Sequence, residues 1–294
     1  MKKTGVVFLF LTTVLLYSCD YVTMPYPKKT VTPPPVNGYV KKVLVEEYTA
    51  SQCVNCPHAA AAADLLRNNN KGRVITIAVH CSSLAAPSGS TFTYDFRTPA
   101  GDNYNATYVD GDNEGLPSGM IDRVSWQPGT GFPKSDNSYQ TDWTSFTNTR
   151  LASTDSVYLQ ITNNYSSSTR LLNCSIKTKF LTGLTSTYNL VVLMTEDSIA
   201  SPQKDIDSVN VRMHFMHRYV LRGAIDGHPN GTGIPITLPA APVTGDSILT
   251  PVAYTVPASF PSAGICNDKH CYIVAFFYDT VTGDVLQVEE QKLY

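Results

Sequence analysis

The chain has 294 residues, with 22 basic and 24 acidic side chains and a formal net charge of −2. This mildly acidic balance, with no block of basic residues, argues against nucleic acid as a partner. Residues 39–294 are enough for two domains with cores of their own.

The N-terminus has the layout of a secretory signal. Lys2 and Lys3 precede an apolar run from Val6 to Leu16, which is too short to be a stable membrane span. The "LLYSC" ending resembles a bacterial lipobox, so we expect residues 1–18 to be a lipoprotein signal peptide and Cys19 to carry lipid. The alternative is an ordinary secreted protein that is cut nearby. We therefore expect a protein of the bacterial cell envelope that lipid anchors to a membrane, and of the membranes we favour the outer membrane.

Residues 19–38 contain five prolines and few apolar side chains, so they predict an extended tether of up to about 60 Å. An exported chain can keep disulfides. Besides Cys19, six cysteines remain, which is far too few for a small fold that disulfides hold together.

The first half of the mature chain mixes strand and helix. Residues 41–48 and 73–80 are short apolar segments rich in β-branched residues, and the alanine-rich run at 56–72 between them predicts a helix that ends at asparagines and Gly72. Strand, helix and strand in this order imply a right-handed crossover between parallel strands. An α/β domain is therefore expected at 39–150.

The second half has a strand pattern. Residues 171–180 alternate, with Leu172, Cys174, Ile176 and Phe180 on one face. Residues 188–197 predict a buried strand, and residues 271–290 predict a hairpin that turns through Thr280 to Asp284. We expect an all-β, sandwich-like domain at 151–294, with the turn-rich segment 125–140 near the boundary.

The stretch "TASQCVNCPHAAAAADLL" places Cys53 and Cys56 at the mouth of the predicted helix. Such a pair can be half of a metal site, a structural bridge or a redox couple. A zinc site needs four nitrogen or sulfur ligands, and the other close pair, Cys266 and Cys271, lies in the second half. His214 and His217 lie in an apolar stretch with Met213, Phe215 and Met216, where packed or hydrogen-bonded core histidines are commoner than ligands. No metal or cofactor is therefore expected.

The redox interpretation uses the helix. The positive end of a helix lowers the pKa of a nearby thiol from about 8.5 toward roughly 7, which raises the fraction of thiolate. The thiolate is the form that attacks a disulfide. This position favours Cys53 as the nucleophile of the pair.

The chain resembles a thioredoxin-fold protein in two segments. One is "VLVEEYTASQCVNC", a strand that enters the CxxC helix, and the other is "GLPSGMIDR", where Leu116-Pro117 resembles the cis-proline loop that faces the CxxC. The resemblance implies a nucleophilic Cys53, a resolving Cys56, a Pro117 that presents backbone to a substrate, and a Glu47 that moves the proton of Cys56.

Together with "AVHCSSLAAPS" and "HFMHRYVLRGAIDG", these segments are similar to the outer-membrane lipoproteins related to Omp28. The resemblance covers nearly all of the mature chain. It implies a lipid-anchored thioredoxin-like domain followed by a β-rich domain. The family has no agreed biochemical role that the resemblance could transfer to this chain.

The chain departs from the thioredoxin pattern at several points. Gln52 stands where thioredoxins have Trp, and Pro57 lacks an N–H, so the helix can also begin at Cys56. The segment 82–114 is an insertion, which is helical in part around residues 103–108, and it is either a lip at the substrate site or, as we favour, a surface elaboration. The alternative to a proton-transfer role for Glu47 is a strand-end carboxylate that pairs with Lys41 or Lys42 on the surface.

The remaining cysteines are simpler. Cys266 and Cys271 bracket a polar turn and predict a structural disulfide worth roughly 2 kcal/mol. Cys174 is expected to be a buried thiol, and the state of Cys81 is open.

Two functions follow from these alternatives. One is a thiol/disulfide oxidoreductase that acts on extracytoplasmic protein thiols through Cys53 and Cys56. The other is a non-enzymatic binding or structural lipoprotein in which the same pair is a fixed bridge. Fold alone does not choose between them, because function resides in the site.

Overall fold

The computed structural model describes residues 39–109, 111–113, 115–124, 141–208, 211–238, 244–260 and 264–294. The predicted signal peptide, the lipidation site Cys19 and the tether at 19–38 lie outside the described residues, as does the segment 125–140. Within the described ranges, none of the helices is long and apolar enough to span a bilayer.

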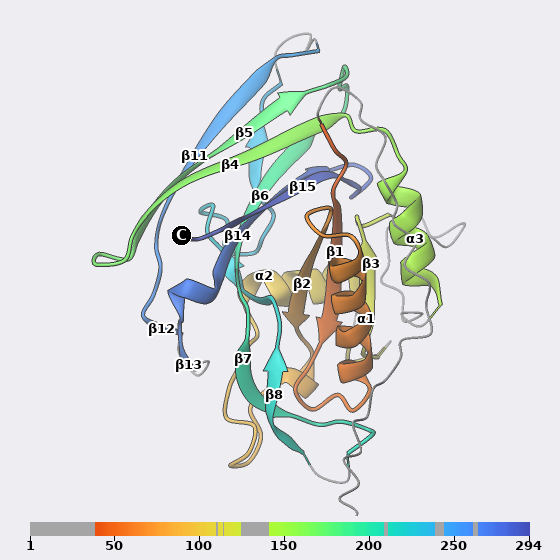
Figure 1. The fold of residues 1–294 in the computed structure, drawn as a ribbon, viewed down its shortest axis with the longest axis vertical. Coiled ribbons are helices and arrows are strands. Elements are labelled where there is room, and N and C mark those ends of the chain that lie inside the picture. Colours follow the sequence, from red (N-terminus) through yellow and green to blue (C-terminus); the bar gives the residue numbers. More distant parts are fainter. Residues whose placement is uncertain are drawn as a thin grey trace, which may run out of the picture. The chain divides into compact units, whose positions relative to one another are not determined.

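A large mixed sheet contains strands from both halves of the chain (Figure 1). In spatial order its strands are β15 (Val285–Lys292), β14 (Cys271–Asp279), β6 (Tyr188–Glu196), β9 (Val220–Ala224), β2 (Val74–His80), β1 (Val43–Thr49) and β3 (Ser118–Ile121), and β10 (Ile234–Ile236) pairs with β6. Strands from before and after the predicted boundary at residue 150 therefore belong to one sheet. All described residues belong to one compact unit.

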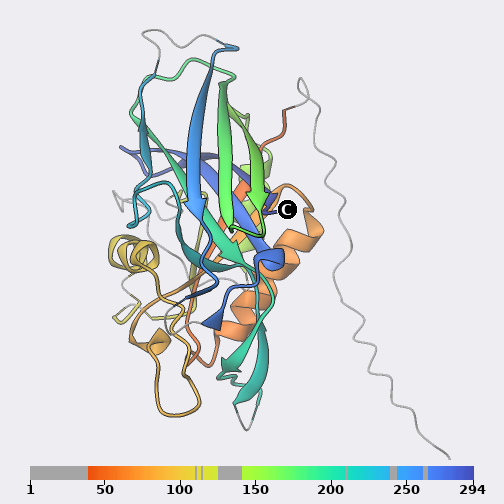
Figure 2. The same cartoon turned by 90° about the vertical axis from the view of Figure 1, so that its left-hand side faces the viewer.

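The other strands form smaller sheets. One sheet has the order β11 (Ser247–Thr255), β5 (Leu171–Phe180), β4 (Val157–Ser166), and the two ribbons are β7 (Ile199–Gln203) with β8 (Arg212–His217) and β12 (Ser259–Phe260) with β13 (Gly264–Ile265). The β11-β5-β4 sheet and the β7-β8 ribbon are also seen in the turned view of Figure 2.

Helical segments are few and short in the described part of the chain. They are α1 (Cys56–Asn69), η1 (Ser83–Ala85), α2 (Pro99–Tyr104), η2 (Asn105–Val109), α3 (Asp142–Leu151) and η3 (Asp268–His270). The fold is thus mixed α/β and dominated by strands in several sheets, which confirms the coarse prediction.

The predicted crossover is present. β1 and β2 are parallel, with Val43 opposite Val74 and Thr49 opposite His80, and α1 connects them. Alternate residues of β1 pack on opposite faces: Val43 and Val45 lie with α1 and α3, whereas Leu44 and Tyr48 lie on the face that α2 covers. Both faces of β1 are buried, which explains its almost unbroken apolar run.

The alternation of β5 is also confirmed. Its inward side chains, Leu172, Cys174, Ile176 and Phe180, are buried against residues of β6 and β14 in one core. The β11-β5-β4 sheet therefore covers that part of the large sheet, and this packing gives the second half its sandwich-like character. Cys174 is a buried free thiol, as expected.

The helical part of the insertion belongs to the core. α2 and η2 bury Ala100, Tyr104, Tyr108 and Val109 against the sheet face opposite α1. The expectation of a mere surface elaboration is wrong for these residues, because Tyr104 and Tyr108 are four apart and give this segment an apolar face.

A buried ion pair of the first half contacts an element of the second half. The guanidinium of Arg123 donates to Glu46 at 2.6 and 2.7 Å, and both side chains are almost fully buried. Its charge also lies over the rings of Tyr104 and, from β14, Phe276, at 4.4 and 4.8 Å from their centroids. Next to it, the buried carboxylate of Asp122 binds Lys41 and Arg150.

Candidate redox site

Cys53 and Cys56 form a disulfide between the end of β1 and the start of α1, with their Cα atoms 5.4 Å apart. The helix begins at Cys56, with Asn55 at the N-cap and Pro57 in the first turn. Proline is well placed there because the first helical N–H groups have no partner within the helix. The positive end of α1 therefore acts most directly on Cys56 rather than on Cys53, as the departure at Pro57 predicts.

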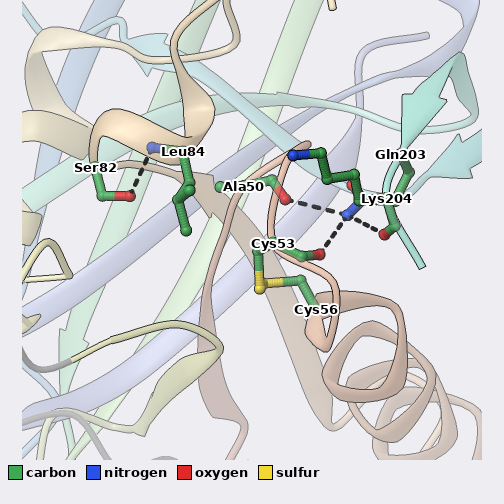
Figure 3. The surroundings of a disulfide bond; sticks show 7 residues. All are labelled: Ala50, Cys53, Cys56, Ser82, Leu84, Gln203 and Lys204. Carbon is green, nitrogen blue, oxygen red and sulfur yellow. Dashed lines mark hydrogen bonds between the residues drawn. A yellow bond between two sulfur atoms is a disulfide. The ribbon is translucent and has the colours of Figure 1, made fainter. Parts of the chain in front are cut away.

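Both cysteines of the disulfide are buried. Cys53 is 4% exposed and Cys56 is 1% exposed. Part of the cover comes from the end of β7: Gln203 Nε2 donates to the carbonyl oxygens of Ala50 and Cys53 at 3.1 and 2.9 Å (Figure 3). The backbone continues this contact, since Lys204 donates to Ser51 and residue 206 donates to residue 54.

The other side of the loop contacts the insertion. The backbone N–H of Gln52 donates to Leu84 in η1, and its side chain donates to Ala86. Ala85 packs with Cys53 and Cys56 in one small cluster. Ser82, the N-cap of η1, has φ of +67°, a conformation that side-chain-bearing residues rarely adopt and that is concentrated at functional sites.

The predicted proline loop meets the same cluster. A cis peptide bond joins Leu116 and Pro117, and Leu116 packs against the residues around the disulfide. Pro117 is buried and directly precedes β3, which pairs antiparallel with β1. The structure thus brings Leu116, Cys53 and Cys56 together from segments that lie about sixty residues apart in the sequence.

Glu47 is buried and lies beneath α1. Burial is the main cause that raises its pKa, to about 8, and the charge of Asp64 adds to the effect. The alternative of a surface ion pair is wrong, because Lys41 binds Asp122 and Lys42 binds Glu289. At neutral pH Glu47 is therefore predominantly a protonated carboxyl group.

A small cavity of about 20 Å³ lies between α1 and the strands β1, β2 and β8. Its lining includes Cys56, Glu47, Thr76, His80 and His217. Sequence analysis missed both the cavity and the part that His80 plays in it. The available signal was the alternation of β2, which puts Thr76 and His80 on the same face as the helix.

The histidines of β8 differ in environment. His217 is buried, as sequence analysis expects, whereas His214 on the same strand is exposed. The difference arises because His214 and His217 are three residues apart and lie on opposite faces of β8, and the face that carries Phe215 and His217 lines the cavity.

Cys266 and Cys271 lie close together as thiols rather than as a bridge, with their Sγ atoms 3.6 Å apart. With Glu196 they form one of two groups of potential metal ligands in the described ranges, and His58, Asp205 and Asp207 form the other. The carboxylate of Glu196 already accepts hydrogen bonds from Arg222 and from the backbone N–H of Asn267. Cys81 is a buried free thiol whose pKa burial raises to about 12.

Comparisons with known proteins give the family and the fold. The sequence model of the family described as "Outer membrane protein Omp28" matches residues 101–294, a range that begins after the disulfide loop and includes Pro117 and His217. HBP35 of Porphyromonas gingivalis has a similar structure, with a TM-score of 0.59 and 14% sequence identity over 87% of this chain and 76% of that chain.

A second solved structure is a domain of the outer membrane lipoprotein Omp28 from Porphyromonas gingivalis. It is 24% identical and covers 48% of this chain and 90% of that chain, with a TM-score of 0.31. No curated protein sequence matches the chain. At these identities, the likeness to HBP35 supports the fold alone.

Proposed function

Since the chain belongs to the Omp28 family of outer membrane proteins, we propose that it is a lipid-anchored envelope protein whose Cys53 and Cys56 exchange disulfides with extracytoplasmic protein thiols. Family membership confirms the predicted location in the cell envelope, at the outer membrane. The observation that carries the redox proposal is a disulfide at a helix start with a protonated carboxyl group on the same cavity.

The local arrangement supports a thioredoxin-like site. β1 leads into the CxxC loop, α1 follows, β2 returns parallel to β1, and the cis Leu116-Pro117 bond precedes the antiparallel strand β3. In this arrangement the backbone beside Pro117 can pair with an extended substrate segment.

The first chemical step is attack on Cys53. A substrate thiolate bonds to Cys53 Sγ, the Cys53–Cys56 bond breaks, and its electron pair stays on Cys56 Sγ as a thiolate. The start of α1 stabilises that leaving thiolate. A second substrate thiolate then displaces Cys53 from the mixed disulfide, so the substrate dithiol is oxidised and the protein disulfide is reduced by two electrons.

Glu47 supplies the proton that the first step requires. Its carboxyl group gives a proton to the Cys56 thiolate through water and becomes a carboxylate, which recovers a proton from solvent. In the reverse direction the same carboxylate removes the proton from Cys56 and so activates it. The raised pKa suits both tasks, because the group then exchanges protons near neutral pH.

Substrate access requires a local movement, since Cys53 is covered by residues 203–206 and by η1. Exposed apolar side chains surround this cover: Val54 between the cysteines, Leu84 in η1, and Ile206. They offer a contact surface to a substrate chain in place of the tryptophan that Gln52 replaces.

The second candidate is a binding or structural lipoprotein with a permanent Cys53–Cys56 bridge. The low exposure of both cysteines favours it, as do the hydrogen bonds that hold residues 50–54 from two sides.

Trapping of partners tests the proposal. In the native host, Cys56→Ser leaves Cys53 without its resolving partner, so we expect DTT-sensitive adducts with other proteins. Cys53→Ser and the double variant are matched controls and form none. If Cys56→Ser also forms none, Cys53 is not a nucleophile and the second candidate is supported.

A further inference from the structure

The cavity behind the disulfide contains an unusual concentration of unpartnered polar atoms. Glu47 Oε1, Thr76 Oγ1, both ring nitrogens of His80 and Nε2 of His217 are buried and have no hydrogen-bond partner among the described residues. The side chains that carry these atoms all line the cavity that Cys56 borders. Buried polar groups are paired in the great majority of cases, so a cluster of exceptions around one space requires an explanation.

The volume of the cavity fits a single water molecule. About 20 Å³ is enough for one water molecule, which needs at least about 10–15 Å³ and between two and four polar partners. A metal ion fits less well, because Glu47, His80 and His217 do not form one of the groups of ligand atoms that lie within 4.8 Å of one another in the described ranges.

The tautomer of His217 follows from its contacts. Its ring bonds to the backbone at Ser201 and Pro202, and only Nε2 is left unpartnered, so Nδ1 carries the proton and donates it to those carbonyl groups. Nε2 is then a lone-pair acceptor on the cavity side. Burial lowers the pKa of His217 to about 4 and that of His80 well below its ordinary value, so both rings are neutral at neutral pH.

We propose that His80 and His217 position a buried water that joins Glu47 to Cys56 and carries the proton between them. The water accepts hydrogen bonds from the Glu47 carboxyl and from an N–H of His80, and it donates to His217 Nε2 and to Cys56 Sγ. These four bonds satisfy the water and four of its neighbours. The inference rests on the proposed function and assigns its proton path to residues from both halves of the chain.

The step is balanced by proton transfer alone. When Cys56 Sγ becomes a thiolate, the water passes it a proton and takes one from Glu47, so Cys56 ends as a thiol and Glu47 as a carboxylate. His80 and His217 keep their protons and act as positioning residues. The other titratable and charged groups that face this site are Asp64 on α1, Arg218 and Tyr219 between β8 and β9, and Arg222 on β9, whose charge acts on His80.

The test is the rate at which DTT reduces the Cys53–Cys56 disulfide in the folded protein, followed from about pH 6 to about pH 9. The wild-type profile is expected to change slope near the Glu47 pKa of about 8. Glu47→Gln should remove that change and slow reduction at neutral pH by about 100-fold or more, which is the lower end of the range of about 10²–10⁴ that proton transfer contributes.

His217→Asn separates the positioning role from a structural one. The asparagine amide keeps a donor for the backbone at Ser201 but has no group at the position of Nε2, so reduction should slow by about tenfold and the change of slope should move. Exposed His214→Asn on the same strand is the matched control and should match the wild type.

The double variant Glu47→Gln/His217→Asn tests whether His217 acts through the same water as Glu47. Because His217 acts only through the water of Glu47, the double variant should be no slower than Glu47→Gln alone. Multiplying effects, or a His217→Asn profile identical to that of the wild type, would overturn the inference while leaving the redox function standing. A wild-type disulfide that DTT does not reduce in the folded protein would overturn the proposed function, and the proton path with it.

Discussion

Glu46 and Glu47 are consecutive residues of β1, both are buried, and they lie on opposite faces of the sheet in opposite electrostatic environments. Glu46 binds the guanidinium of Arg123 through two hydrogen bonds. Glu47 forms no ion pair with a described residue, and its Oε1 has no partner there. Glu46 is therefore paired with a cation, whereas burial without such a partner raises the pKa of Glu47 to about 8 and keeps Glu47 protonated at neutral pH.

Glu47→Gln is expected to stabilise the fold increasingly as pH rises. Glu47 has a pKa of about 8 in the folded chain and about 4.3 in the unfolded chain, so between these values the folded state holds a proton that the unfolded state lacks. The free energy of unfolding of the wild type then falls by about 1.4 kcal/mol for each pH unit in this range, and the fall ends above the pKa of Glu47 in the folded chain.

Urea unfolding of the wild type and Glu47→Gln at several pH values measures this difference. The advantage of the variant should grow up to about pH 8 and then stay constant. A difference that does not depend on pH would show that Glu47 is ionised in the folded protein.

Removing Arg123, the partner of Glu46, should lower the free energy of unfolding. Arg123→Met leaves Glu46 as a buried unpaired charge, with an expected loss of about 3–5 kcal/mol in the free energy of unfolding. Glu46→Gln/Arg123→Met removes both charges and should recover part of that loss. Urea unfolding measures both, and a loss below about 1 kcal/mol for the single variant, the range of an exposed pair, would contradict the assignment.

The lipid anchor is tested at Cys19, which lies outside the described residues. Cys19→Ala should yield an unlipidated precursor, because no thiol is left to carry the acyl chains, and the protein should leave the membrane fraction. Membrane fractionation and intact mass of the mature protein check this result. Unchanged fractionation would contradict lipid anchoring by this residue.

The Cys266–Cys271 bridge remains a prediction. Its closure requires the two Sγ atoms to approach from 3.6 Å to about 2.05 Å. For protein isolated from the envelope without reductant, alkylation after unfolding should leave both cysteines unlabelled. The variant Cys266→Ser/Cys271→Ser should lose roughly 2 kcal/mol of stability in the loop-entropy description. Full labelling of both cysteines would show a permanent thiol pair.

The elements with strong local patterns could be predicted from the sequence. The strands at 43–49, 74–80 and 171–180 and the helix after Cys53 are present, because periodicity and β-branched or alanine-rich composition act over a few neighbouring residues. The start of the helix at Cys56 also followed from Pro57.

The joining of the two halves could not be predicted in this way. The pairing of β2 with β9 and the place of Phe276 beside Arg123 are contacts between residues far apart in the chain, which a local pattern does not encode. The same holds for the site: Gln203 binds the disulfide loop and His217 lines the cavity behind it, from opposite ends of the β7-β8 ribbon, through contacts between distant parts of the chain. Their sequence surroundings give no sign of that destination.

The most direct test of the redox proposal is the reduction potential of the Cys53–Cys56 disulfide in the folded protein. It is measured by equilibration with glutathione or DTT buffers and alkylation of the free thiols, with Cys266→Ser/Cys271→Ser as the background so that only one pair responds. A redox-active pair should give a potential between about −270 and −120 mV, the range of thiol/disulfide oxidoreductases. A potential below about −300 mV would identify a structural bridge and contradict the proposed function.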